Sequence, residues 1–222
     1  MNYFKLHVVT QVCLAAMILA IGSVMILPEH FWELPIIILY LFQELLFFLP
    51  LYVFVLRKYK PTWRDLGWVP VRFKPFLKTL GLALGIFIAI ELILSFIGSN
   101  WPNLPGFSPQ EEFLSTAKGR LLDQIILFVI AIGIAPFLEE LFFRGFMLKT
   151  LMGHMTFMRA SLISGLFFTI VHFQFESFFL IFPLALLLNW IYRRHNSIIP
   201  GIFFHIVNNA LALIIELVIT KS

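Results

Sequence analysis

The chain has 222 residues, of which 60% are hydrophobic and 13% charged. Soluble domains are closer to half apolar and a quarter charged, so this composition excludes a soluble protein and, with apolar runs recurring from end to end, leaves no room for a separate soluble domain. The formal net charge of +4 is spread over short loops, which argues against a nucleic-acid partner.

Seven apolar segments predict an all-α fold, a polytopic bundle of about seven transmembrane helices. In chain order, they cover residues 6–27, 35–56, 79–97, 121–151, 160–173, 178–192 and 198–220. The fourth segment is too long for one simple crossing, so we expect it to tilt, to kink near Pro136 or to extend beyond the bilayer. The fifth and sixth segments are short, as expected for helices that neighbouring protein covers.

The basic residues predict how the bundle is oriented. The loop at 57–78 holds seven lysines and arginines, and the alternation of the segments places 13 of the 16 basic residues on the same side as this loop. Because loops rich in lysine and arginine stay in the cytoplasm, we expect a cytoplasmic N-terminus. Seven crossings then place the C-terminus on the opposite side.

Two adjacent glutamates and an arginine interrupt the apolar stretch FLEELFFRGF of the fourth segment. Ionisable groups inside a membrane are costly, and each one therefore needs a partner or a function. Glu140 and Arg144 are four residues apart, so they share a helix face and can pair. Glu139 points about 100° away and has no partner at helical spacing. One carboxylate can therefore be held by the arginine while Glu139 stays free for chemistry.

Polar side chains of three segments are predicted to lie at one depth. With a rise of about 1.5 Å per residue, Glu139 lies about 18 Å from residue 151 and His172 about 18 Å from residue 160. Asn209 lies about 16 Å from residue 198, and His205 shares its face one turn nearer the cytoplasm. Such a layer favours a functional site, with a buried network that fixes helix packing as the alternative.

Other polar residues of the apolar segments receive a structural interpretation. Glu44, Glu91 and Glu216 each stand alone, which favours structural or interfacial roles. Asn189 and Trp190, near the end of the sixth segment, are interpreted as an anchor at the membrane surface.

The residue types suit amide hydrolysis. A carboxylate and an imidazole can share the work of a general base on water, while an amide and a second imidazole can donate hydrogen bonds to an oxyanion. A zinc site built from Glu139, His172 and His205 is the chemical rival. We expect a site without metal, because Glu139 as a ligand would leave no obvious carboxylate base and Asn209 is a poor zinc ligand.

The ordered motifs resemble those of the CAAX-protease and bacteriocin-processing family, also called the Abi family, which includes Rce1-type prenyl-protein endopeptidases. The motifs that carry this resemblance are Glu139-Glu140-x-x-x-Arg144, Phe168-x-x-x-His172 and His205-x-x-x-Asn209. The resemblance covers residues 121–210. It divides the chain into transmembrane helices without a recognisable motif at 1–120 and a CAAX-protease-like catalytic core at 121–222.

The resemblance implies a glutamate-type intramembrane endopeptidase that uses no metal or other cofactor. Glu139 and His172 would activate water, His205 and Asn209 would form the oxyanion site, and Glu140 and Arg144 would support them. The expected partners are the lipid bilayer and a peptide or protein substrate, lipidated or not, of a CAAX-type or bacteriocin-like kind. The expected location is the plasma membrane of a prokaryote.

Two other classes of function stay open at the level of sequence. The first is a non-catalytic membrane protein, for bacteriocin self-immunity or scaffolding, in which the motifs form a structural network. The second is a transporter or proton relay, which is weakened because the acids and histidines do not recur in both halves of the chain as an inverted repeat would require.

Overall fold

A computed structural model describes residues 4–31, 34, 36–101, 104–105, 125–126 and 128–219. Within these residues every regular element is a helix, and the seven predicted segments correspond to seven helices or series of helical segments. They are α1 (Leu6–Ile26), α2 (Ile36–Leu51) continued by η2 (Tyr52–Leu56) and α3 (Arg57–Tyr59), α4 (Phe73–Asn100), the series η4 (Ile130–Ile134), α6 (Ala135–Glu140), η5 (Leu141–Leu148) and α7 (Lys149–Met152), then α8 (Phe157–Val171), α9 (Phe178–His195) and α10 (Ile199–Ile219).

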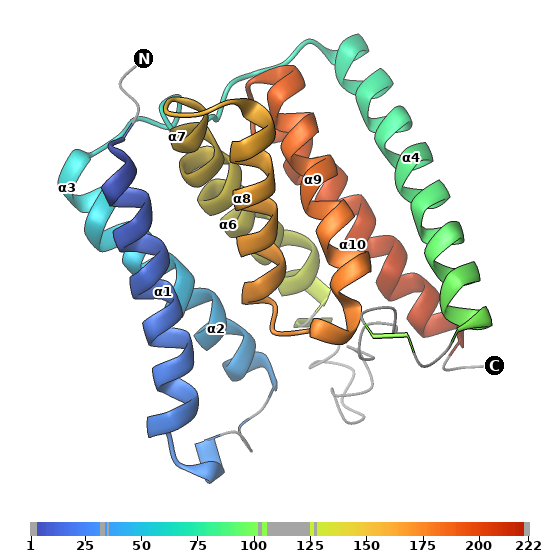
Figure 1. Ribbon diagram of the computed structural model, residues 1–222, viewed down its shortest axis with the longest axis horizontal. Helices are drawn as coiled ribbons and strands as arrows, with labels where there is room; N and C mark the ends of the chain where they lie inside the picture. Colours follow the sequence, from blue (N-terminus) through green and yellow to red (C-terminus); the bar gives the residue numbers. More distant parts are fainter. Residues whose placement is uncertain are drawn as a thin grey trace.

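The helices form a bundle in which α1 and α2 lie on one side, α4 lies on the other, and the helices of the second half of the chain lie between them (Figure 1). The beginning of α1 and the end of α10 lie at opposite ends of the bundle, as an odd number of crossings requires. Three helices within the described residues are long and apolar enough to cross a membrane alone: Leu6–Ile26, Ile37–Tyr59 and Phe73–Asn100. The all-α membrane bundle predicted from the sequence is thus confirmed.

The fourth predicted segment changes its helical geometry near Pro136. The π-helical segment η4 ends at Ile134, and Pro136 then stands in the first turn of α6. Proline has no N–H to donate and its ring crowds the preceding turn, so a wider π turn is one way to accommodate it. A second π-helical segment, η5, begins directly after Glu140. Residues 121–124 and 127 of the predicted segment lie outside the described residues.

The largest apolar core joins both halves of the chain. Val8 and Val12 of α1 and Val55 of η2 belong to the same buried cluster as Phe146 of η5 and Phe168 of α8. Dispersion between closely packed side chains holds such bundles together within a membrane. The motif-bearing helices are therefore packed against the α1–α2 hairpin, and the proposed boundary at 120 does not separate two independent cores.

The loop between α3 and α4 inserts into the bundle and fixes two of its elements. The Leu66 side chain is buried, and its carbonyl oxygen lies so close to Gly145 of η5 that a Cβ there would be 2.5 Å away. Gly67 has a positive φ of 81°, which favours glycine, and its carbonyl accepts a hydrogen bond from Ile198 N–H at 2.9 Å. The Lys149 ammonium donates to the carbonyl of Asp65 at 2.5 Å. These contacts fix η5 and the beginning of α10, which carry site residues.

Candidate active site

Arg144 is the centre of a buried polar network. Its guanidinium forms an ion pair with Glu140 at 2.8 Å, and both side chains are completely buried. It also donates to Asn189 Oδ1 and to the Ala185 carbonyl, each at 3.0 Å. The Phe168 ring covers its face, with its centroid 4.8 Å from Cζ. Because the planar fork of arginine satisfies three acceptors at once, this charge is compensated within the apolar bundle.

The structure corrects the interpretation of Asn189. This residue is completely buried, and its amide donates to the Ser161 carbonyl at 3.0 Å while its oxygen accepts from Arg144. The prediction of an anchor at the membrane surface is therefore wrong for Asn189, and Trp190 is partly buried against the α4–α9–α10 cluster. When a helix has apolar residues on all sides, its sequence does not indicate which of its faces contacts an arginine of another helix. The buried amide in an apolar helix was the available signal.

His205 lies against both glutamates. Its Nε2 is 3.7 Å from Glu139 Oε2, and its Nδ1 is 3.4 Å from Glu140 Oε1. In the described part of the chain, Oε2 of each of the two glutamates has no hydrogen-bond partner. Gly201, one turn before His205, allows this close approach of α10, because a Cβ there would lie 2.6 Å from Glu140 Oε2.

His172 lies at the end of α8 with one ring nitrogen already engaged. Its Nδ1 is 2.6 Å from the carbonyl oxygen of Phe168. A carbonyl oxygen can only accept, so Nδ1 must carry the proton in this hydrogen bond. In the neutral ring, Nε2 is then the unprotonated nitrogen and can accept a proton or a hydrogen bond.

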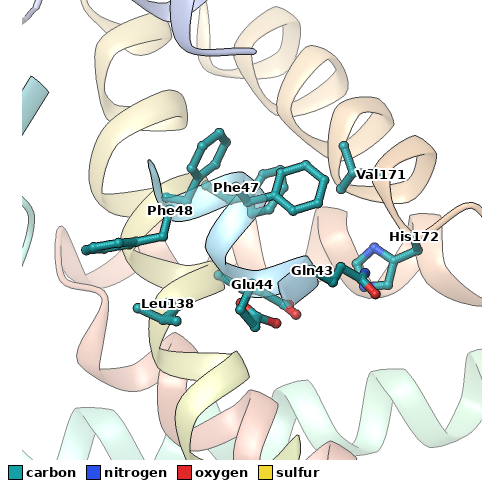
Figure 2. A pocket seen from close by; sticks show the side chains of 10 residues that line it. Gln43, Glu44, Phe47, Phe48, Leu138, Val171 and His172 are labelled. Atoms are coloured by element: carbon teal, nitrogen blue, oxygen red, sulfur yellow. The ribbon is translucent and has the colours of Figure 1, made fainter. Parts of the chain in front are cut away.

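Glu139 and His172 line one cavity, with walls from α2, the α6–η5 series and the end of α8 (Figure 2). The space that the centres of water molecules can occupy is about 40 Å³, which is enough to admit water beside the carboxylate and the imidazole. The lining residues are Gln43, Glu44, Phe47, Phe48, Leu138, Glu139, Phe142, Phe143, Val171 and His172.

The cavity also contains a residue that we had interpreted as isolated. Glu44 of α2 lines it together with Glu139, and the two carboxylates interact electrostatically. The prediction that Glu44 stands alone is therefore wrong. Its segment contains no motif, and only the packing of α2 against the second half of the chain brings this carboxylate to the site. Glu91 of α4 does not line the cavity, and the side chain of Glu216 lies outside the described residues.

Asn209 lies one turn beyond His205 on α10, but neither residue is among those that line the cavity. The Asn209 amide donates one hydrogen bond to the Ala131 carbonyl of η4 at 2.9 Å, and its oxygen accepts from Asn208 at 3.3 Å. One amide N–H of Asn209 is thus used within the bundle. The second N–H is the donor that a substrate could use.

The arrangement separates a structural part from a chemically accessible part. Glu140, Arg144 and Asn189 are completely buried, and Arg144 donates to both of the other side chains. Glu139 and His172 instead face a cavity that admits water. Among the described residues, no group of three or more histidine, cysteine, aspartate or glutamate side chains has the arrangement of a metal site. Metal-independent chemistry stays a prediction.

Comparison with known proteins identifies the part of the chain that carries these residues. Residues 121–211 match the family model described as type II CAAX prenyl endopeptidase Rce1-like. No curated protein and no solved structure matches significantly. The match includes all three motifs and confirms the resemblance seen in the sequence, and it supports a membrane protease as the kind of protein. Residues 121–211 are therefore similar to the Rce1-like family of type II CAAX prenyl endopeptidases.

Proposed function

We propose that the protein is an intramembrane endopeptidase that hydrolyses a peptide bond of a membrane-associated peptide or protein with water activated by Glu139 and His172. One observation carries this proposal. Both side chains line the same water-sized cavity, and His172 has its Nδ1 bound to the Phe168 carbonyl, which leaves Nε2 free to accept.

In the proposed reaction, the Glu139 carboxylate removes a proton from a water molecule that also donates a hydrogen bond to His172 Nε2. The water oxygen then attacks the substrate carbonyl, and the proton returns to the nitrogen of the leaving amine when the C–N bond breaks. His205 Nε2 lies 3.7 Å from Glu139 Oε2, which is too far for a hydrogen bond. The products are a carboxylic acid and an amine.

We propose, on the basis of the family resemblance, that His205 and Asn209 form the oxyanion site. Both residues lie on α10, next to Glu139 but outside the cavity lining. A substrate carbonyl would therefore have to lie on the α10 side of Glu139. There the free amide N–H of Asn209 and a ring N–H of His205 could donate to the developing negative charge.

Arg144 and Glu140 support the site and do not take part in the chemistry under this proposal. Arg144 holds the Glu140 carboxylate, and that carboxylate lies 3.4 Å from His205 Nδ1. The fully buried network thereby fixes the position of His205, which in turn contacts Glu139. Precise positioning of this kind is a large part of catalysis by preorganised groups.

The test is hydrolysis by the purified protein in lipid vesicles. Prenylated and unprenylated peptides with the same sequences are added, and mass spectrometry identifies cleaved products. Glu139→Gln keeps the shape of the side chain and removes its basic oxygen, so it should abolish cleavage. Glu91→Gln, which changes a carboxylate away from the cavity, should cleave like the wild type.

The alternative, a non-catalytic membrane protein for self-immunity or scaffolding, has one observation in its favour. The network of Arg144, Glu140, Asn189 and Ser161 joins four helical segments through buried hydrogen bonds. That network explains no role for Glu139 and His172 in the cavity. Wild-type protein that cleaves no peptide of the set would favour this alternative.

A further inference from the structure

Two parts of the chain form opposite walls of the cavity. Glu139 and His172 belong to residues 121–211, which match the Rce1-like family model. Gln43 and Glu44 belong to α2, which lies outside the match. Figure 2 shows both α2 side chains on one helix, across from His172 on another. A substrate side chain that enters the cavity beside Glu139 and His172 therefore lies against α2.

The polar side of this α2 wall is acidic. Glu44 is partly buried and, within the described part of the chain, forms no ion pair or hydrogen bond with another residue. Neither lysine nor arginine is among the residues that line the cavity. An uncompensated carboxylate in a membrane cavity favours a cationic or hydrogen-bond-donating ligand and disfavours an anionic one.

The remaining lining is mostly aromatic. Phe47 and Phe48 of α2 and Phe142 and Phe143 of η5 lie beside the two carboxylates. Aromatic faces bind the methylene stems of lysine and arginine and attract their charged ends. An apolar surface that ends at a carboxylate is thus complementary to a long basic side chain.

We propose that Glu44 is a specificity-determining residue that binds a lysine or arginine side chain of the peptide substrate next to the bond that is cleaved. This inference rests on the proposed function and adds to it the chemical class of the substrate. Glu44 contacts the substrate without taking part in the proton transfers, which belong to Glu139 and His172. Gln43 lies next to it and supplies a neutral amide to the same wall.

The test uses pairs of synthetic peptides, prenylated and unprenylated, in proteoliposomes. The members of each pair differ only in one residue, which is lysine in one and norleucine in the other, and this residue is moved through all positions. Loss of a charged hydrogen bond predicts that Glu44→Gln lowers kcat/KM for the best lysine peptide by about ten- to a hundredfold. Its norleucine partner should change less than about twofold, and Glu91→Gln should change neither. Glu44→Lys should reverse the preference, so that a glutamate peptide is cleaved better than its glutamine partner.

Two results of the cleavage assay would overturn the inference. An equal loss for the lysine and norleucine peptides in Glu44→Gln would place Glu44 in the chemistry or in folding. Unchanged discrimination in Glu44→Gln would show that Glu44 does not contact the basic side chain.

Failure of the proposed function is recognised separately, because wild-type protein would then cleave no peptide at all. In that case, binding of the same pairs to wild-type protein in nanodiscs decides the inference. Tighter binding of lysine peptides that is lost in Glu44→Gln supports the inference, and equal binding of both members of the pairs overturns it.

Discussion

Replacing Arg144 by alanine should destabilise the protein far more than replacing Glu139 by glutamine. The change removes a guanidinium that donates to Glu140, Asn189 and the Ala185 carbonyl at 2.8–3.0 Å. A buried acceptor left without its donor costs about 1–3 kcal/mol, and loss of one partner of a buried ion pair costs about 3–5 kcal/mol. We therefore expect the free energy of unfolding to fall by about 4 kcal/mol. Domains are stable by only about 5–15 kcal/mol, so this loss approaches global unfolding.

Glu139→Gln provides the contrast, because among the described residues the Glu139 carboxylate has no ion pair with arginine or lysine, and it lines the cavity. Its stability should change by less than about 1 kcal/mol. Arg144→Lys is the matched control for charge. It keeps the positive charge but replaces the planar fork by a point charge, so it should recover only part of the loss.

The assay is equilibrium unfolding in mixed micelles of a mild detergent and dodecyl sulfate, followed by tryptophan fluorescence. The expected order of stability is wild type and Glu139→Gln together, then Arg144→Lys, then Arg144→Ala. If Arg144→Ala unfolded with the wild type while Glu139→Gln lost stability, the structural and chemical roles of these residues would be reversed.

Two further predictions concern the approach of α10 and the use of metal. Gly201→Ala places a Cβ 2.6 Å from Glu140 Oε2, so it should lower the free energy of unfolding by about 1–3 kcal/mol and displace His205. Gly133→Ala is the control, because its Cβ meets nothing within 4 Å and the variant should be nearly neutral in the same unfolding series. Equal stability of the two alanine variants would show that α10 does not lie against Glu140. Activity should persist after prolonged chelation, and stoichiometric zinc whose removal abolishes activity and whose addition restores it would contradict metal-independent chemistry.

The sequence predicts the helices well because membrane-spanning length and apolarity are local properties. Helical spacing also identifies Glu140 as the partner of Arg144, and the two are paired in the structure at 2.8 Å. This pairing needs only the geometry of one helix, since residues four apart share a face. The common depth of Glu139 and His172 likewise follows from the helical rise and the alternation of the segments.

Contacts between helices are less accessible from one sequence. Asn189 and Glu44 lie in segments that are apolar on nearly all sides, so no periodicity indicates which face meets the site. Packing of α9 against η5 brings Asn189 to Arg144. Packing of α2 against α6 brings Glu44 to the cavity. The contact of Leu66 with Gly145 likewise cannot be predicted from the sequence, because it depends on the path of a loop between helices.

The most direct test of the central claim is product formation in ¹⁸O-labelled water. Wild-type protein in proteoliposomes is incubated with the peptide set, and the products are analysed by mass spectrometry beside Glu139→Gln and Glu91→Gln. Hydrolysis predicts cleaved peptides with ¹⁸O in the newly formed carboxyl group for wild type and Glu91→Gln, and no product for Glu139→Gln. Equal product from Glu139→Gln, in a variant that unfolds like the wild type, would contradict the assignment of Glu139 as the base that activates water.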